Sequence, residues 1–147
     1  MRNEDVVIRK FQIEDYEAVI SLWKIGEIPY KPRGRDTRDK ILEEITKETA
    51  IFLVAEIDGQ VVGSVLGTHD GRKGWINRLA TAPEFRQRGI ARLLLKEAED
   101  KIHELGIEII ACLIEDYNRG SMDFFQHAGY TKHTDIIYFT KRKYPEV

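Results

Sequence analysis

One stretch near the middle of the chain carries most of the information about its fold: Leu79-Ala80-Thr81-Ala82-Pro83-Glu84-Phe85-Arg86-Gln87-Arg88-Gly89-Ile90-Ala91. Residues 75–81 are typical of a strand, which Pro83 ends. From Arg88 to Leu105 the apolar residues then recur with helical spacing. A strand, a turn containing glycine and a long helix therefore follow one another directly.

The turn at Gly89 has the properties of an anion-binding site. The first turn of any helix presents unpaired N–H groups and the positive end of the helix dipole. Gly89 has no Cβ to keep a ligand from the backbone, and Arg86, Arg88 and Arg92 add positive charge. We interpret the turn as a cradle for a diphosphate, although an ordinary helix start with surface arginines has the same spacing. The pattern is neither a P-loop nor the dinucleotide-binding G-x-G-x-x-G.

The segments that follow the long helix complete a strand–helix–strand unit. Gly106 is a natural helix end, and Ile107–Ile114 is almost continuously apolar, which predicts a strand buried on both faces. Two strands joined by a helix in this way lie parallel. A short helix over Asn118–Ala128 and a last strand over Ile136–Thr140 are expected to follow.

The segments before the decisive stretch predict an edge strand over Val6–Phe11 and two helices. The first helix has an apolar stripe formed by positions i, i+3, i+4 and i+7 from Tyr16. Asp36 or Thr37 can cap the second helix. The positions of the second helix that are expected to face inward are Ile41, Leu42 and Ile45.

An antiparallel meander is predicted between these helices and the decisive stretch. Ile51–Ile57 and Gln60–Gly67 form strands joined by an Asp58-Gly59 turn, and Trp75–Thr81 is the third strand. The predicted fold class is therefore α/β of the mixed α+β kind, with a central mixed sheet flanked by helices.

Length, composition and charge restrict the class of protein. We expect the 147 residues, 1–147, to form a single domain, and 42% apolar with 33% charged residues is a globular profile. A net charge of −2 argues against nucleic-acid binding. No apolar run has the length of a membrane span, and the start lacks a secretory signal. Cys112 is a lone cysteine, and the histidines lack ligand spacing, so we expect a cytoplasmic protein without a metal.

Two motifs resemble those of the GNAT superfamily of N-acetyltransferases. Arg86-Gln87-Arg88-Gly89-Ile90-Ala91 resembles its R/Q-x-x-G-x-G/A signature, and Pro83-Glu84-Phe85 resembles the lead-in to that signature. Asn118-x-x-Ser121-x-x-Phe124-Phe125, followed by Gly129-Tyr130, resembles its second motif. The resemblance runs from about Val6 to Phe139 and includes the order of the elements. It implies a GNAT-like acyl-CoA N-acyltransferase fold and an acetyl-CoA-dependent N-acetyltransferase.

The resemblance also implies where the co-substrate acetyl-CoA binds. Backbone N–H groups at 86–92 would hold its pyrophosphate. Its pantetheine arm would lie between strands 75–81 and 107–114, paired with a bulged strand through Leu79 and Thr81. Asn118 would donate a hydrogen bond to that arm. The full implied binding set is Leu79, Ala80, Thr81, Arg86, Gln87, Arg88, Gly89, Ile90, Ala91, Arg92, Asn118, Ser121 and Phe125.

The implied reaction is direct acetyl transfer to a primary amine, without a covalent enzyme intermediate. The amine must lose a proton, and Glu115 and Asp116 are the candidate bases, although a solvated strand end is the plainer interpretation of both. Weaker candidates are Glu27, His69 and Asp70.

One position departs from the pattern that the resemblance implies. Many members carry a tyrosine where this chain has Phe125, and that tyrosine protonates the departing thiolate. Phe125 has no hydroxyl group. The tyrosines nearest to it in the sequence are Tyr117, Tyr130 and Tyr138, although a core or rim aromatic is the plainer interpretation of each.

Three functions remain open at this point. The first is an N-acetyltransferase acting on a small-molecule or peptide amine, in a family whose members are often homodimers. The second is a non-catalytic acetyl-CoA or acyl-CoA sensor module, motivated by Phe125. The third is a structural α/β domain whose helix start binds a generic anion. The basic loop over Tyr30–Arg38 is either an ordinary solvated loop or a rim that favours an acidic acceptor.

Overall fold

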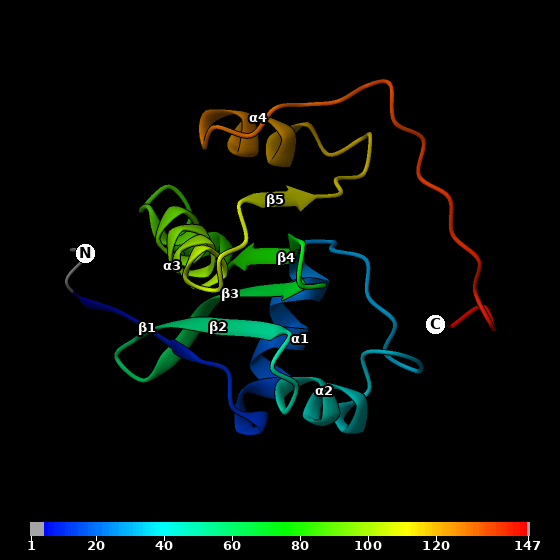
Figure 1. Ribbon diagram of the computed structural model, residues 1–147. Helices are drawn as coiled ribbons and strands as arrows, with labels where there is room; N and C mark the ends of the chain where they lie inside the picture. Colours follow the sequence, from blue (N-terminus) through cyan, green and yellow to red (C-terminus); the bar gives the residue numbers. More distant parts are fainter. Residues whose placement is uncertain (1–4, 147) are drawn as a thin grey trace.

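The computed structural model describes residues 5–146 and contains a five-stranded sheet with helices on both faces (Figure 1). The strand order is β1-β2-β3-β4-β5. The strands are β1 (Val6–Lys10), β2 (Ala50–Ile57), β3 (Gln60–His69), β4 (Lys73–Thr81) and β5 (Ile109–Cys112). The helices are α1 (Tyr16–Ile25), α2 (Arg38–Ile45), α3 (Ile90–Glu104) and α4 (Arg119–His127), with short 3-10 turns η2 (Ile13–Asp15) and η3 (Pro83–Phe85).

The strand pairing confirms the predicted meander and the strand–helix–strand unit. Strands β1 to β4 pair antiparallel in sequence order. Asp58 and Gly59 between β2 and β3 have φ values of 49° and 80°, as a two-residue hairpin turn of type I′ requires. Strand β5 pairs parallel to β4, and α3 connects the two. The predicted mixed sheet is therefore correct.

Two hydrophobic cores lie on opposite faces of the sheet because side chains alternate along each strand. On one face, Leu53 of β2 packs in the cluster that contains Leu94 of α3 and Phe125 of α4. On the other face, its neighbour Phe52 packs with Trp23 of α1. Helices α3 and α4 thus cover one face, and α1 and α2 cover the other.

Two strand glycines allow α3 to lie close to the sheet. A Cβ at Gly63 would come within 3.0 Å of Leu94, and a Cβ at Gly74 would come within 2.7 Å of Ile102. A side chain at either position would push the helix outward. The glycines therefore fix the height of α3 above β3 and β4, and with it the position of the first turn of α3.

The prediction that Leu42 faces inward is wrong. Ile41 is buried, whereas Leu42 is 45% exposed. Consecutive positions on a helix are about 100° apart, so an eight-residue helix that contacts the core through Ile41 turns Leu42 toward solvent.

Two predictions about the end of the chain are also wrong. The segment Ile107–Ile114 forms only the short strand β5, and Ile109 and Leu113 are each 56% exposed rather than buried on both faces. The predicted strand over Ile136–Thr140 is absent from the sheet. In the described part of the chain β5 has β4 as its neighbour on one side, and its other edge is open. Residues 136–140, which the sequence predicts to be a strand, pair with no described strand either.

Among the described residues, no helix combines the length and the apolar character needed to cross a bilayer.

Candidate active site

The cleft of the candidate site begins at a bulge in β4. The β3–β4 register passes from Leu66↔Arg78 to Gly67↔Ile76, so Asn77 is an extra residue in β4. Pairing of β4 with β5 ends at Ile76, directly before the bulge. Beyond that point the two strands separate, as the family resemblance implies for the signature strand.

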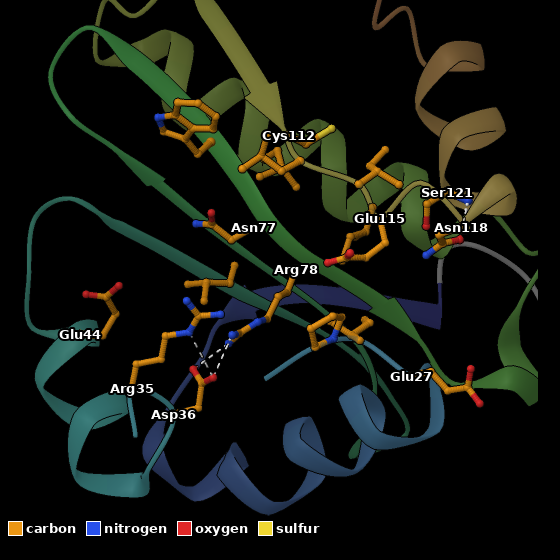
Figure 2. Close-up of a pocket in the computed structure, with 18 of the residues that line it drawn as sticks. Glu27, Arg35, Asp36, Glu44, Asn77, Arg78, Cys112, Glu115, Asn118 and Ser121 are labelled. Atoms are coloured by element: carbon orange, nitrogen blue, oxygen red, sulfur yellow. Dashed lines mark hydrogen bonds and ion pairs between the residues drawn. The ribbon is translucent and has the colours of Figure 1, made fainter. Parts of the chain in front are cut away.

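A cleft of about 610 Å³ opens where the strands separate (Figure 2). Its walls come mainly from β4, the end of β5 and the residues after it, the start of α4, the loop and helix over residues 27–47, and Tyr138 and Tyr144 near the end of the chain. The lining includes Glu27, Arg35, Asp36, Lys40, Glu44, Arg78, Leu79, Cys112, Glu115, Tyr117, Asn118, Ser121, Phe125, Tyr138 and Tyr144.

The backbone of β4 offers groups to this opening that do not bond to β3, although the Thr81 carbonyl accepts a long hydrogen bond of 3.4 Å from Arg86 Nε. Ala82 N–H donates to the carbonyl of Val62 at 2.8 Å. Because alternate residues of an antiparallel strand bond to the same neighbour, Ala80 also faces β3, and Leu79 and Thr81 face away from it. The Oγ1 atom of Thr81 is buried and has no hydrogen-bond partner within the described part of the chain. This half of β4 therefore has hydrogen-bonding capacity that the fold itself does not use.

The loop before α3 has the backbone conformation of an anion site. Gln87 and Gly89 have φ values of 64° and 79°, so left-handed residues flank Arg88. Alternation of this kind gathers successive N–H groups into a concave surface that suits an anion. The first turn of α3 contains no acidic residue, and residues 86–89 are exposed. Arg88 lies 5.3 Å from the centre of the Phe85 ring.

The start of α4 forms the neighbouring wall of the cleft. Asn118 caps the helix, because its Oδ1 accepts a hydrogen bond from Ser121 N–H at 3.1 Å. This bond fixes the orientation of the amide, whose Nδ2 can donate to a ligand. Phe125 is buried, with Phe124 and Tyr130 packed edge-on at 5.3 and 5.0 Å. The structure thus brings Asn118, Ser121 and Phe125 to the same cleft as Leu79.

A buried ion pair anchors the opposite wall. Arg78 of β4 donates to both carboxylate oxygens of Asp36, at 2.7 and 2.8 Å, and both side chains are almost fully buried. Asp36 also accepts from Lys31 N–H at 2.6 Å, and the Arg78 guanidinium lies 4.4 Å from the Trp23 ring centre. The cap of α2 is therefore Thr37, which accepts from Lys40 N–H at 3.2 Å, and Asp36 instead ties the loop to the sheet.

Carboxylates are available on two sides of the cleft. Figure 2 shows the Glu115 carboxylate pointing into the space between Arg78 and Asn118. Asp116, the next residue, is exposed and does not line the cleft. Glu27 lines the opposite rim with a left-handed φ of 54°, a conformation that costs a non-glycine residue about 1–2 kcal/mol.

The tyrosines near Phe125 differ in whether their hydroxyl groups are free to act in the cleft. Tyr130 donates its hydroxyl to Glu99 at 2.7 Å, and burial together with this bond raises the pKa of Tyr130. Tyr117 and Tyr138 line the cleft and are exposed. Burial raises the pKa of the Cys112 thiol to about 11, so this thiol is protonated at neutral pH and is not a nucleophile.

Sequence reasoning missed the pairing of Asp36 with Arg78 and the contribution of Tyr144 to the cleft. No sequence signal links Asp36 to Arg78 across 42 positions. Glu27, which the sequence offers only as a weak candidate for the base, lines the cleft. The weakly predicted base candidates His69 and Asp70 do not line the cleft. No cluster of side chains suited to a metal ion occurs within residues 5–146.

Comparisons with known proteins agree with this geometry. The model of the acetyltransferase (GNAT) family matches residues 16–130. The fold is similar to that of PaiA N-acetyltransferase from Thermoplasma acidophilum in complex with coenzyme A, with 25% identity, a TM-score of 0.73 and coverage of 84% of this chain and 87% of that one. It is also similar to AAC(6')-Iy in complex with the bisubstrate analogue CoA-S-monomethyl-acetylneamine (20% identity, TM-score 0.78, coverage 93% and 98%). Ard1 from Thermoplasma volcanium gives 21% identity, a TM-score of 0.76 and coverage of 86% and 83%.

The chain belongs to the acetyltransferase (GNAT) family, because the matched residues 16–130 make up most of its length. It is an acetyl-CoA-dependent N-acetyltransferase, with acetyl-CoA as its co-substrate. The predicted family, fold and enzyme class are therefore confirmed.

Proposed function

We propose that the protein transfers the acetyl group of acetyl-CoA directly to a primary amine on a small molecule or a peptide. The observation that carries this proposal is the opening beside Asn77, where unpaired β4 backbone, the capped start of α4 and the carboxylate of Glu115 surround one cleft. A single domain over residues 1–147 and a cytoplasmic location stay predictions from the sequence.

The chain's own groups fit the co-substrate from its phosphates to its thioester. The N–H groups of the loop and first turn at 86–92 hold the pyrophosphate, assisted by the three arginines of that segment. The backbone of Leu79 and Thr81 pairs with the pantetheine arm as a neighbouring strand would. Asn118 donates from Nδ2 to the same arm, because its Oδ1 is already held by Ser121.

Transfer requires removal of a proton and stabilisation of an oxyanion. Glu115 takes a proton from the substrate ammonium, directly or through water, so that the nitrogen lone pair can attack the thioester carbonyl carbon. The N–H of Leu79 stabilises the negative charge that develops on the carbonyl oxygen. The carbon–sulfur bond then breaks, and the departing thiolate takes a proton from water or from the hydroxyl of Tyr117 or Tyr138 in the open cleft.

Thiol release with a panel of amines tests the proposal. We expect amine-dependent release from the wild type and a fall of about 10²-fold or more in kcat for Glu115→Gln, because the loss of a general base typically costs that much. Glu27→Gln and Asp116→Asn, measured alongside, identify which carboxylate carries the fall in kcat. A wild-type kcat in Glu115→Gln would assign the base elsewhere.

A second candidate function, an acyl-CoA sensor, is favoured by one observation. Phe125 is buried among aromatic rings at the position where a thiolate proton donor is expected. A sensor binds acetyl-CoA but releases no thiol with any amine. For the enzyme, we expect Phe125→Tyr to raise kcat several-fold and to alter the basic limb of the pH profile. An unchanged kcat and pH profile would mean that thiolate protonation does not limit the rate.

A further inference from the structure

The part of β4 that borders the cleft is held at one edge only. Pairing with β5 ends at Ile76, so beyond that residue β3 is the only neighbouring strand in the described part of the chain. The bulge at Asn77 weakens even this pairing, because a bulge disrupts the ladder locally and increases the twist of the strand. Yet the N–H of Leu79 needs a fixed position if it is to stabilise a developing oxyanion. A further contact is therefore needed to hold this half of β4.

Arg78, the first residue after the bulge, supplies such a contact. The bulge shifts the alternation of side chains by one, so that Ile76 lies in the core beside α3, whereas the Arg78 guanidinium lies 4.4 Å from the ring centre of Trp23, in the core beside α1. There it donates hydrogen bonds of 2.7 and 2.8 Å to the two carboxylate oxygens of Asp36. A planar guanidinium that lies over an aromatic ring and is bonded at two points has little freedom to rotate.

Asp36 is itself held from two further sides. Lys31 N–H donates to its carboxylate at 2.6 Å, and the hydroxyl of Tyr16 in α1 donates to its carbonyl at 2.7 Å. Thr37, the next residue, caps α2. Asp36 is thus a fixed point where the loop over residues 31–36, α1 and α2 meet, and the Arg78 side chain joins β4 to that point (Figure 2).

Stability alone does not explain a charged pair at this place. The side chains of Arg78 and Asp36 are 7% and 4% exposed, and the cost of taking two charges out of water offsets much of their attraction. Apolar residues of similar size are often equally stable in such positions. What two parallel hydrogen bonds add is a defined geometry. The residue that they hold begins the peptide unit that carries the Leu79 N–H.

We propose that Arg78 is a positioning residue for acetyl transfer, and that its pair with Asp36 holds the Leu79 N–H at the thioester carbonyl. The inference rests on the proposed function, in which that N–H stabilises the oxyanion. Arg78 touches no reacting atom. It acts through the peptide unit that joins it to Leu79, and a shift of such a unit by about 1 Å is enough to cost about 10²-fold in rate.

The test compares two arginines that form the same kind of pair. Arg78→Lys keeps the charge but loses the two-point geometry. Arg9→Lys is the matched control, because Arg9 donates to both carboxylate oxygens of Asp15, at 2.8 and 2.9 Å, and neither residue lines the cleft. We expect kcat to fall at least about tenfold in Arg78→Lys and to keep its wild-type value in Arg9→Lys. Acetyl-CoA affinity should change little in either variant, since the loop at 86–89 is left intact.

The infrared spectrum of the bound thioester reports positioning without turnover. A hydrogen bond from Leu79 N–H lowers the stretching frequency of the carbonyl, which isotope-labelled acetyl-CoA makes visible in the complex. We expect a lowered frequency in the wild type and in Arg9→Lys, and a return toward that of free acetyl-CoA in Arg78→Lys. Asp36→Asn keeps the size of its side chain but loses the charge and should behave as Arg78→Lys does, so the test stands even if one of the two variants does not fold.

Three results would overturn the proposal. The first is a carbonyl frequency in Arg78→Lys and Asp36→Asn that equals that of the wild type, whatever the kcat. The second is an equal change in Arg9→Lys, which would mean that loss of stability alone moves the carbonyl. The third is a wild-type complex with the frequency of free acetyl-CoA.

Failure of the proposed function gives a different pattern. In that case no amine releases thiol from the wild type. A lowered carbonyl frequency that is lost in Arg78→Lys but kept in Arg9→Lys would still support the positioning role of Arg78.

Discussion

In the half of the site that we propose for the coenzyme, the binding groups belong mainly to the backbone of one stretch, residues 79–92, which reaches the cleft at Leu79. On the α1 face they are side chains from distant segments, chiefly Asp36, Arg78 and Glu27. Backbone groups depend on local conformation and on the absence of obstructing side chains. A buried ion pair depends on both of its partners at once.

This difference teaches where each half of the site is vulnerable. The coenzyme half, residues 79–92, should tolerate changes in most side chains and fail at particular glycines. The wall formed by Asp36, Arg78 and Glu27, which we propose as the acceptor half, should fail when one charge is removed. Four pairs of variants test that contrast.

Removing one charge from the acceptor half should cost the most. Asp36→Ala leaves Arg78 buried without its partner, and we expect a loss of about 3–5 kcal/mol in the free energy of unfolding, measured in urea. The control Arg35→Ala removes an exposed cation 3.7 Å from the same carboxylate and should cost less than about 1 kcal/mol. Equal effects of the two variants would remove the contrast between the halves.

The glycine at the helix start tests the coenzyme half. Gly89→Glu combines a left-handed φ of 79° with an acid at the anion site, and we expect acetyl-CoA affinity to fall roughly 100-fold, or about 2.7 kcal/mol, by titration calorimetry. Gly106→Glu is the matched control at the other end of α3, where φ is 84° and nothing lies within 4 Å. It carries the same backbone strain and should bind as the wild type does. Unchanged binding by Gly89→Glu refutes the assigned site.

A second glycine sharpens the same half by testing packing rather than binding. In Gly74→Ala the new methyl group would lie 2.7 Å from Ile102, and we expect a loss of about 1–3 kcal/mol in unfolding free energy from overpacking. Gly120→Ala, with its nearest neighbour atom at 4.0 Å, should be neutral or slightly stabilising. Similar stabilities for the two variants would mean that α3 moves freely.

The smallest expected effect concerns an ion pair beside α1. Burial opposes ionisation of Asp15, but hydrogen bonds from Arg9 and from Gln12 N–H hold its pKa below the usual value. Its contribution is therefore present above about pH 4 and is lost as the pH falls through the lowered pKa. Asp15→Asn should cost about 1 kcal/mol at pH 7 and nothing at low pH, whereas exposed Glu14→Gln should be neutral throughout. A difference that persists in acid would exclude this mechanism.

The same contrast explains how much the sequence could predict. The strand, turn and helix around Gly89 and the Asn118 cap follow from local signals such as Pro83, glycine spacing and a capping residue, and the structure contains them all. The partners of Asp36 do not follow from local signals. An aspartate at this position is compatible with a helix cap, but Thr37 caps α2 and Asp36 forms a buried ion pair with Arg78 instead.

The errors at the end of the chain share a physical cause. The apolar patterns of 107–114 and 136–140 predicted strands, because β-branched and aromatic residues favour extended backbone. A strand also needs a neighbour to pair with, and an apolar pattern does not specify one. Residues 109–112 form a short strand beside β4, and residues 136–140 form none.

The extra residue at position 77 has a consequence for how such a protein can diverge. Deleting Asn77 would restore an even ladder and allow β4 to remain joined to its parallel neighbour, which would close the space between them. No other side chain of the cleft would need to change. A single insertion or deletion at this position can therefore open or close the space between the two strands in a relative that keeps the same sheet.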